Sequence, residues 1–342
     1  MHGRLEWVEI DAPALEGNAL GDPARRPLLV YVPPGYGADA GTAGARRVPV
    51  VYFLHGFTGS ARAWINVSPF QPSVPERLDA LVAAGSMPPV LGVFVDGWTR
   101  LGGSQWIDSE GIGAYRTYVA RDVVGFVDAR YPTVRDPAAR AVVGKSSGGY
   151  GALVMGAYHP DVFAHVASHA GDAGFEYCYL PDLPRAAAAL QGTDPAAWLE
   201  AMRARARDAG LRGEDHPTLN VLAMAAAYSP RHGAPLGIDL PFDPVTARLR
   251  PEVWERWLAH DPVRFVPARL ASFRRLRSTY LDCGARDEFQ LRWGTRMVVE
   301  ALRAGGVEVA HEEFEDGHRG IDYRYARSLT HLGARLGAGA AT

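Results

Sequence analysis

The chain has 342 residues, with 36 Lys and Arg against 38 Asp and Glu, so its formal net charge is −2. This balance excludes the general electrostatic attraction on which binding to nucleic acid or an acidic membrane surface depends, and we predict neither partner. Hydrophobic residues make up 47% and charged residues 22%, which is typical of a globular protein and excludes a disordered or fibrous chain. No apolar run approaches the roughly 18 residues of a membrane-spanning helix.

The beginning of the chain, from Met1 to Trp7, lacks the basic end followed by an apolar core that is typical of a secretory signal, so we predict a cytoplasmic protein. The two cysteines, Cys178 and Cys283, are too few for a disulfide framework or a cysteine zinc site, and we expect buried, reduced thiols. We expect no metal and no cofactor. A homo-oligomer is compatible with this composition.

Strand and helix patterns alternate along the first half of the chain. Residues 5–10 and 27–32 are typical of strands and begin the sheet antiparallel. From residue 50 onward, apolar runs typical of strands buried on both faces alternate with segments of helical periodicity, which predicts a parallel sheet covered by helices. The expected strands are 50–54, 90–95, 141–143 and 163–168, and the expected helices are 75–84, 115–131 and 152–158.

The alternation stops near Gly171 and resumes with a strand over 278–283, a helix, a strand over 307–311 and a helix over 321–332. The segment between has helical patterns of its own, as so long an interruption requires. We predict an α/β core of residues 1–171 and 273–342, with a mainly helical cap, residues 172–272, inserted after the sixth core strand. The helix after strand 278–283 has its apolar face at Phe289, Trp293, Met297 and Ala301, and the cap helices cover 184–211, 219–227 and the region of Trp254 and Trp257.

The sharpest motif is the Gly-x-Ser-x-Gly sequence from Gly144 to Gly148, which lies between a predicted strand and a predicted helix. In such a nucleophile elbow the serine, here Ser146, stands on a strained turn at the end of the sheet, and side chains at the two glycines would clash with neighbouring backbone. The helix that follows begins with free N–H groups, which stabilise an oxyanion. Ser147 is the alternative nucleophile, but no Gly-x-Ser-x-Gly frames it.

A serine nucleophile requires a general base, and after a nucleophile elbow the acid and the histidine follow in that order on later loops. Asp287 comes just after strand 278–283, and His318 comes just after strand 307–311. We therefore predict a triad of Ser146, Asp287 and His318.

Other acidic and histidine residues near these strands fit a triad less well. His311 and Asp282 fall within predicted strands, and Glu288 is expected to begin a helix. Asp172 follows strand 163–168, a position where some hydrolases carry the acid, and it stays open as the alternative to Asp287.

The segment from His55 to Gly59 follows strand 50–54, where an oxyanion-hole donor is expected. A His-Gly pair is a weak signal in isolation and gains its weight from this position. We predict that the backbone N–H groups of Phe57 and Ser147 hold the oxyanion and that His55 orients the loop.

Together these motifs resemble the esterase D-like branch of the α/β-hydrolases, which contains S-formylglutathione hydrolases, feruloyl esterases, enterochelin-type esterases and mycolyltransferases. The resemblance extends from Leu5 to Leu336 without the cap and includes the segments 26–36, 95–97 and 317–318. It implies an α/β-hydrolase fold, a Ser/Asp/His triad, an acyl-enzyme intermediate and no metal. Carried over to this chain, the triad roles fall on Ser146, Asp287 and His318.

Two features depart from that family, and further residues are secondary candidates. Lys145 stands where formylglutathione hydrolases carry a histidine, and the cap is longer than in the small members. Ser109 and Asp96 fall on loops that the family keeps near the site, where a structural role is favoured for both.

We interpret the chain as a serine carboxylesterase that acts on a small-molecule ester. An acyltransferase with the same triad and a catalytically silent binding protein of the same fold are the alternatives. The aromatic residues of the cap either line an acyl or aryl pocket or form the core of the cap itself; they are Phe175, Tyr177, Tyr179, Trp254 and Trp257.

Overall fold

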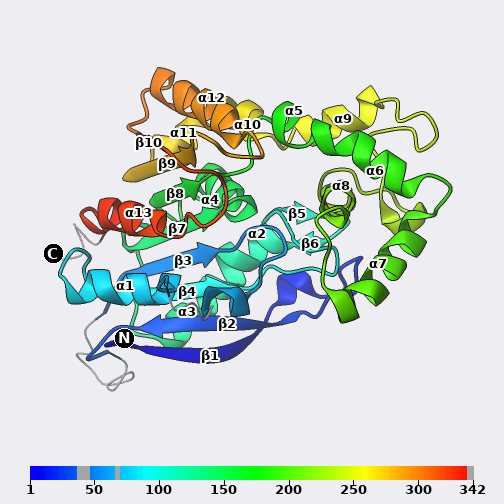
Figure 1. Ribbon diagram of the computed structural model, residues 1–342. Helices are drawn as coiled ribbons and strands as arrows, with labels where there is room; N and C mark the ends of the chain where they lie inside the picture. Colours follow the sequence, from blue (N-terminus) through cyan, green and yellow to red (C-terminus); the bar gives the residue numbers. More distant parts are fainter. Residues whose placement is uncertain (37–46, 66–69, 337–342) are drawn as a thin grey trace.

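An eight-stranded sheet forms the centre of the computed structural model, which describes residues 1–36, 47–65 and 70–336 (Figure 1). The strand order is β1-β2-β4-β3-β7-β8-β9-β10. The β1–β2 and β2–β4 pairs are antiparallel and all other neighbouring pairs are parallel, which confirms the predicted antiparallel start and mostly parallel sheet. The strands are β1 (Arg4–Asp11), β2 (Arg25–Val32), β3 (Val50–Leu54), β4 (Leu91–Val95), β7 (Arg140–Lys145), β8 (His165–His169), β9 (Ser278–Gly284) and β10 (Ala310–Phe314), with a separate hairpin of β5 (Asp108–Ser109) and β6 (Gly113–Ala114).

Helices cover both faces of the sheet, because successive residues of each strand point to opposite faces. In β3, Val51 and Phe53 belong to the apolar cluster that includes α1 (Val74–Ala83) and α13 (Arg324–Gly333). Tyr52 and Leu54 belong to the cluster on the other face, which includes α3 (Val124–Arg130), α4 (Ser147–Tyr158) and α12 (Leu291–Ala304). No helix within the described ranges is long and apolar enough to cross a membrane.

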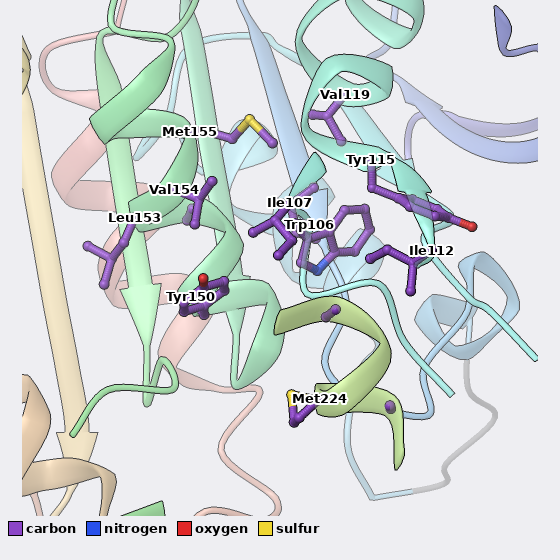
Figure 2. Packing of buried hydrophobic residues seen from close by; sticks show 14 of the residues in the cluster. Trp106, Ile107, Ile112, Tyr115, Val119, Tyr150, Leu153, Val154, Met155 and Met224 are labelled. Carbon is purple, nitrogen blue, oxygen red and sulfur yellow. The ribbon is translucent and has the colours of Figure 1, made fainter. Parts of the chain in front are cut away.

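A buried tryptophan anchors the loop that follows β3. Trp106 is 1% exposed and lies between helix α4 and the segment that contains Tyr115 (Figure 2). Its ring fills the space at Gly97 and Gly151, where an added Cβ would come within 2.5 Å of it. Its Nε1 donates a hydrogen bond of 3.1 Å to the carbonyl oxygen of His55, so the packing of this ring fixes the backbone at the end of β3.

The segment between β8 and β9 is helical, as predicted, and α6 to α9 stand beyond the ends of the central strands (Figure 1). The stretch expected as one helix over 184–211 forms two, because Gly192 has a φ of 70° and Asp194 then caps a new helix by accepting the N–H groups of Ala196 and Ala197. The division of residues 172–272 from the core as a separate cap domain stays a prediction. The helices are α5 (Phe175–Cys178), α6 (Leu183–Leu190), α7 (Pro195–Ala209), α8 (Asp215–Tyr228), α9 (Pro251–Leu258), α10 (Pro262–Ala268) and α11 (Leu270–Phe273).

Three elements of the core differ in detail from the prediction. The helix expected over 115–131 consists of α2 (Tyr115–Thr117), a π-helical turn (Tyr118–Val123) and α3. The last strand begins at Ala310 rather than Val307, because its pairing with β9 starts at Ala310, opposite Tyr280. Residues 307 and 309 are buried before it, and β10 itself is a charged edge strand whose glutamates pair with arginines. The predicted apolar face of α12 is wrong: Met297 is exposed and Trp293 stacks under two arginines, whereas the buried residues are Leu291, Gly294, Thr295, Val298, Val299 and Leu302.

Candidate active site

The carboxyl ends of the parallel strands open into one pocket of about 390 Å³. Ser146 and Ser147 follow β7, Asp172 follows β8, and His318 follows β10, and all four line this pocket. Asp287, which follows β9, lies directly behind His318 and is 2% exposed. The sheet thus brings together residues that are up to 172 positions apart in the chain, as the parallel topology requires.

Ser146 occupies a strained backbone conformation. Its φ is 58° and its ψ is −129°, values that an L-residue adopts at a cost of order 1–3 kcal/mol. Two backbone hydrogen bonds of 2.9 Å hold the turn: Ser146 N–H donates to the carbonyl of His169, and Tyr150 N–H donates to the carbonyl of Ser146. Helix α4 starts at the next residue, so the side chain stands at a helix N-terminus.

The two glycines of the motif are required by the space around them. A Cβ at Gly148 would lie 1.9 Å from the carbonyl oxygen of Leu54, and a Cβ at Gly144 would lie 2.3 Å from the backbone of Gly148. Helix α4 therefore packs backbone against backbone on β3, and only glycine fits at either position. This contact confirms the clash that the motif predicts.

The ring of His318 is held by a buried carboxylate. Its Nδ1 forms a 2.8 Å hydrogen bond with Oδ2 of Asp287. The other carboxylate oxygen, Oδ1, accepts the backbone N–H groups of Phe289 at 2.9 Å and Leu291 at 3.3 Å. Cys283 lies below, with its Sγ 3.7 Å from Oδ2. Backbone N–H groups and the Cys283 thiol therefore hold the carboxylate in place. The carboxylate in turn fixes which nitrogen of His318 faces away from it.

Other acidic residues near the histidine have different partners. Glu288 does not begin α12 as expected; its Oε2 accepts the backbone N–H of His318 at 2.5 Å and its carboxylate covers Gly317. Asp282 lies within β9, as predicted, and is bound to His169 at 2.7 Å. Asp172 lines the pocket but is hydrogen-bonded to other groups, so the structure pairs Asp287, and not Asp172, with the ring of His318.

The loop after β3 passes directly beside the serine. A Cβ at Gly56 would lie 3.2 Å from Cβ of Ser146 and 3.8 Å from its Oγ. His55 Nδ1 is 2.8 Å from the carbonyl of Gly56, and its Nε2 accepts the N–H of Gly97 at 2.9 Å. Burial lowers the pKa of His55, which favours the neutral ring that this hydrogen bond needs. Phe57 follows on the same loop and lines the pocket.

The secondary candidates differ in whether they line the pocket and in what they bind. Lys145 lines the pocket and forms an ion pair of 3.3 Å with Asp322. Ser109 lies outside the residues that line the pocket, and its Oγ donates to the carbonyl of Ala226 at 3.3 Å, linking the β5–β6 hairpin to α8. Asp96 forms a buried ion pair with Arg26, beneath the loop after β3.

Fewer aromatic residues of the helical insertion line the pocket than the sequence analysis considered. Of the five aromatics considered, Tyr179 lines it; Phe175, Trp254 and Trp257 are buried elsewhere, and Tyr177 is exposed. The pocket wall is instead an aromatic series in which His216 packs against Phe57 and Phe289, and Phe289 packs edge-on against His318 at 4.9 Å. Sequence analysis missed His216, because nothing in its local sequence distinguishes it from the other histidines.

A second serine–histidine–aspartate arrangement lies inside the protein. His169 is 2.7 Å from Asp282 through Nδ1 and 2.8 Å from Ser328 Oγ through Nε2. All three residues are at most 1% exposed, so no substrate reaches them. Arg324 also donates to Asp282, at 2.9 Å, which makes this a structural network beneath Ser146.

The described residues do not assemble a metal-binding group. Across residues 1–36, 47–65 and 70–336, no cluster of three or more His, Cys, Asp or Glu side chains is arranged to hold a metal ion. Cys178 and Cys283 are both buried and unpaired.

The chain is similar to known esterases over nearly its whole length. A ferulic acid esterase superimposes with a TM-score of 0.61 at 19% identity, covering 97% of this chain and 98% of the other. S-formylglutathione hydrolases from Staphylococcus aureus (TM-score 0.60, 12% identity, 97% and 100% covered) and Agrobacterium tumefaciens (0.56, 15%, 98% and 96%) share the α/β-hydrolase fold. The family model described as "Putative esterase" matches residues 20–326. The chain therefore belongs to this esterase family, a group of hydrolases that act on ester bonds.

Proposed function

We propose that the protein is a serine carboxylesterase that hydrolyses a small-molecule ester with Ser146, His318 and Asp287 as its triad. One observation carries the proposal: a serine on a strained elbow shares a pocket with a histidine whose Nδ1 is bound by a buried carboxylate. Family membership supports an ester as the substrate.

In the proposed mechanism, Nε2 of His318 removes the proton of Ser146 as Oγ attacks the ester carbonyl. The N–H groups of Phe57 and Ser147 hold the oxyanion of the tetrahedral intermediate. The alcohol leaves with a proton from His318, and an acyl-enzyme remains on Ser146. Water activated by His318 then releases the acid. Asp287 keeps the proton of the neutral ring on Nδ1 and stabilises the imidazolium that forms.

The helical insertion, residues 172–272, is proposed to act as the cap that selects the substrate. Its helix α8 contributes His216 and Asn220 to the pocket, and the segment around α5 contributes Cys178 and Tyr179. Burial lowers the pKa of His216, so its ring is neutral near pH 7 and suits an apolar wall. These contacts support a role for the insertion in substrate choice.

A series of p-nitrophenyl esters from acetate to decanoate tests the proposal, with labelling by a fluorophosphonate as a second readout. Ser146→Ala is expected to lower kcat by about 10⁴- to 10⁶-fold and to abolish labelling. Ser109→Ala is the matched control, because Ser109 lies outside the pocket, and it should keep wild-type activity. Substantial hydrolysis by folded Ser146→Ala would overturn the proposal.

A further inference from the structure

One oxygen of the Asp172 carboxylate is saturated by the protein and the other is not. Oδ2 accepts hydrogen bonds from Tyr179 OH at 2.8 Å, Gln105 Nε2 at 3.0 Å and Ser147 Oγ at 3.1 Å. Among the described residues no hydrogen bond reaches Oδ1. Asp172 is 6% exposed and lines the pocket beside Ser146, so Oδ1 is the oxygen that can take a partner from the pocket.

Two strained segments position this carboxylate. Ala170, two residues before Asp172, has a φ of 43°, and Gln105, which donates to Oδ2, has a φ of 51°. Gly171, between Ala170 and Asp172, is packed so closely that a Cβ would lie 2.4 Å from Ser168 Oγ. Residues other than glycine persist in the left-handed region where the surrounding structure requires it, and such residues gather at functional sites.

The mechanism above leaves Asp172 without a part, because His318 is already bound by Asp287. A carboxylate this deeply buried is costly unless each oxygen is satisfied. Burial raises the pKa of Asp172, and the hydrogen bonds from Gln105, Tyr179 and Ser147 oppose that rise. The protein supplies partners for Oδ2 only.

We propose that Asp172 binds a hydrogen-bond donor of the substrate, a hydroxyl or an ammonium group, close to the scissile ester. The inference rests on the proposed esterase function and narrows its substrate to esters that carry such a donor on the acyl or the alcohol part. An ester without the donor leaves Oδ1 buried and unpaired in the complex, which costs enough to lower kcat/KM about tenfold or more.

Matched ester pairs test this proposal on the full-length protein. One series places a hydroxyl or an amino group at successive positions of the acyl chain, a second places it on the alcohol, and each ester is compared with its unsubstituted analogue. Wild type should prefer a donor-bearing ester by about tenfold or more in kcat/KM in at least one series. A stronger preference for the amino compound identifies an ammonium as the ligand, and a stronger preference for the hydroxy compound identifies a hydroxyl.

Asp172→Asn should abolish or reverse that preference. Gln105 Nε2 can only donate, so it holds the amide oxygen of an asparagine at the Oδ2 position, and the NH₂ group then faces the pocket and opposes a donor of the substrate. Asp239→Asn is the matched control, because Asp239 is also a buried carboxylate of the insertion but pairs with arginines outside the pocket. It should keep the wild-type preference.

The outcomes separate this proposal from the proposed function. Wild type that is labelled by a fluorophosphonate and hydrolyses esters without preference for a donor overturns the role of Asp172 and leaves the esterase function standing. Wild type that neither reacts nor hydrolyses any ester contradicts the esterase function itself. If Asp172→Asn does not fold, Asp172→Ala replaces it: loss of Oδ1 must abolish the preference for a donor-bearing ester, and an unchanged preference overturns the proposal.

Discussion

The carboxylate of Glu288 accepts the backbone N–H of His318 at 2.5 Å, whereas its neighbour Asp287 binds the ring Nδ1 of the same histidine at 2.8 Å. Two adjacent carboxylates thus hold one residue, one through its backbone and one through its ring. Only the second contact acts on the ring nitrogen atoms, which transfer protons in the proposed mechanism. Their substitution should therefore affect activity very differently.

We predict that Asp287→Asn lowers kcat for p-nitrophenyl acetate by about 10⁴-fold, because an asparagine amide can hold the ring in the wrong tautomer. Glu288→Gln should lower it less than about tenfold, because an amide oxygen still accepts the N–H of His318. Steady-state kinetics on both variants, with melting temperatures to verify folding, measure the difference. Equal losses in the two variants would mean that Glu288 supplies the charge that His318 requires.

The glycines of the elbow give a second prediction, on stability. Gly148→Ala should destabilise the protein by about 3 kcal/mol or prevent its folding, because the new Cβ would lie 1.9 Å from the carbonyl oxygen of Leu54. Gly125→Ala is the matched control: no atom lies within 4 Å of its added Cβ, and in helix α3 it should stabilise by about 0.5–1 kcal/mol. Urea denaturation of both variants measures the two changes, and a Gly148→Ala protein as stable as wild type contradicts the backbone contact.

The predicted residues that the structure brings together are those with a strong local signal. Ser146 lies inside a motif, and Asp287 and His318 each follow a recognisable strand, so the parallel topology alone brings them to one edge of the sheet. The Ser146–Asp287–His318 arrangement needed no knowledge of side-chain packing. The sheet itself was predictable for the same reason, because continuous apolar runs mark strands that are buried on both faces.

The features that sequence analysis missed depend on contacts between distant segments. Asp172 was considered only as an alternative acid of the triad, because its partners at residues 105, 147 and 179 come from three different loops and helices. His216 reaches the pocket only because α8 packs across the strand ends. The face of α12 was mistaken because Trp293 is covered by arginine side chains rather than by the core, a contact that hydrophobicity does not reveal.

The buried arrangement of Ser328, His169 and Asp282 gives a third prediction. Ser328→Ala removes the partner of His169 Nε2 at a site with no access to water, so it should cost about 1–3 kcal/mol in free energy of unfolding. Because Ser328 does not reach the pocket, the variant should still be labelled by a fluorophosphonate. Denaturation and labelling of the same sample check both parts; loss of labelling in a folded variant would show that this network controls the position of Ser146.

The last prediction concerns stability in acid. His165 is fully buried between Ser278 Oγ at 2.7 Å and the carbonyl of Ala138 at 2.9 Å, and burial lowers its pKa to about 4. In the unfolded chain a histidine titrates near pH 6.5, so below that pH the unfolded state binds the extra proton. Stability is therefore complete above pH 6.5 and falls as the pH drops toward 4.

At about 1.36 kcal/mol for each pH unit, His165 accounts for a loss of about 2 kcal/mol between pH 6.5 and pH 5. Burial also lowers the pKa of His260 to about 4, so this residue adds to the loss in the same direction. Urea denaturation at pH 7, 6 and 5 measures the slope. His165→Gln should be less stable than wild type at pH 7 but lose less stability on acidification, and an unchanged slope in this variant contradicts the assignment of the proton to His165.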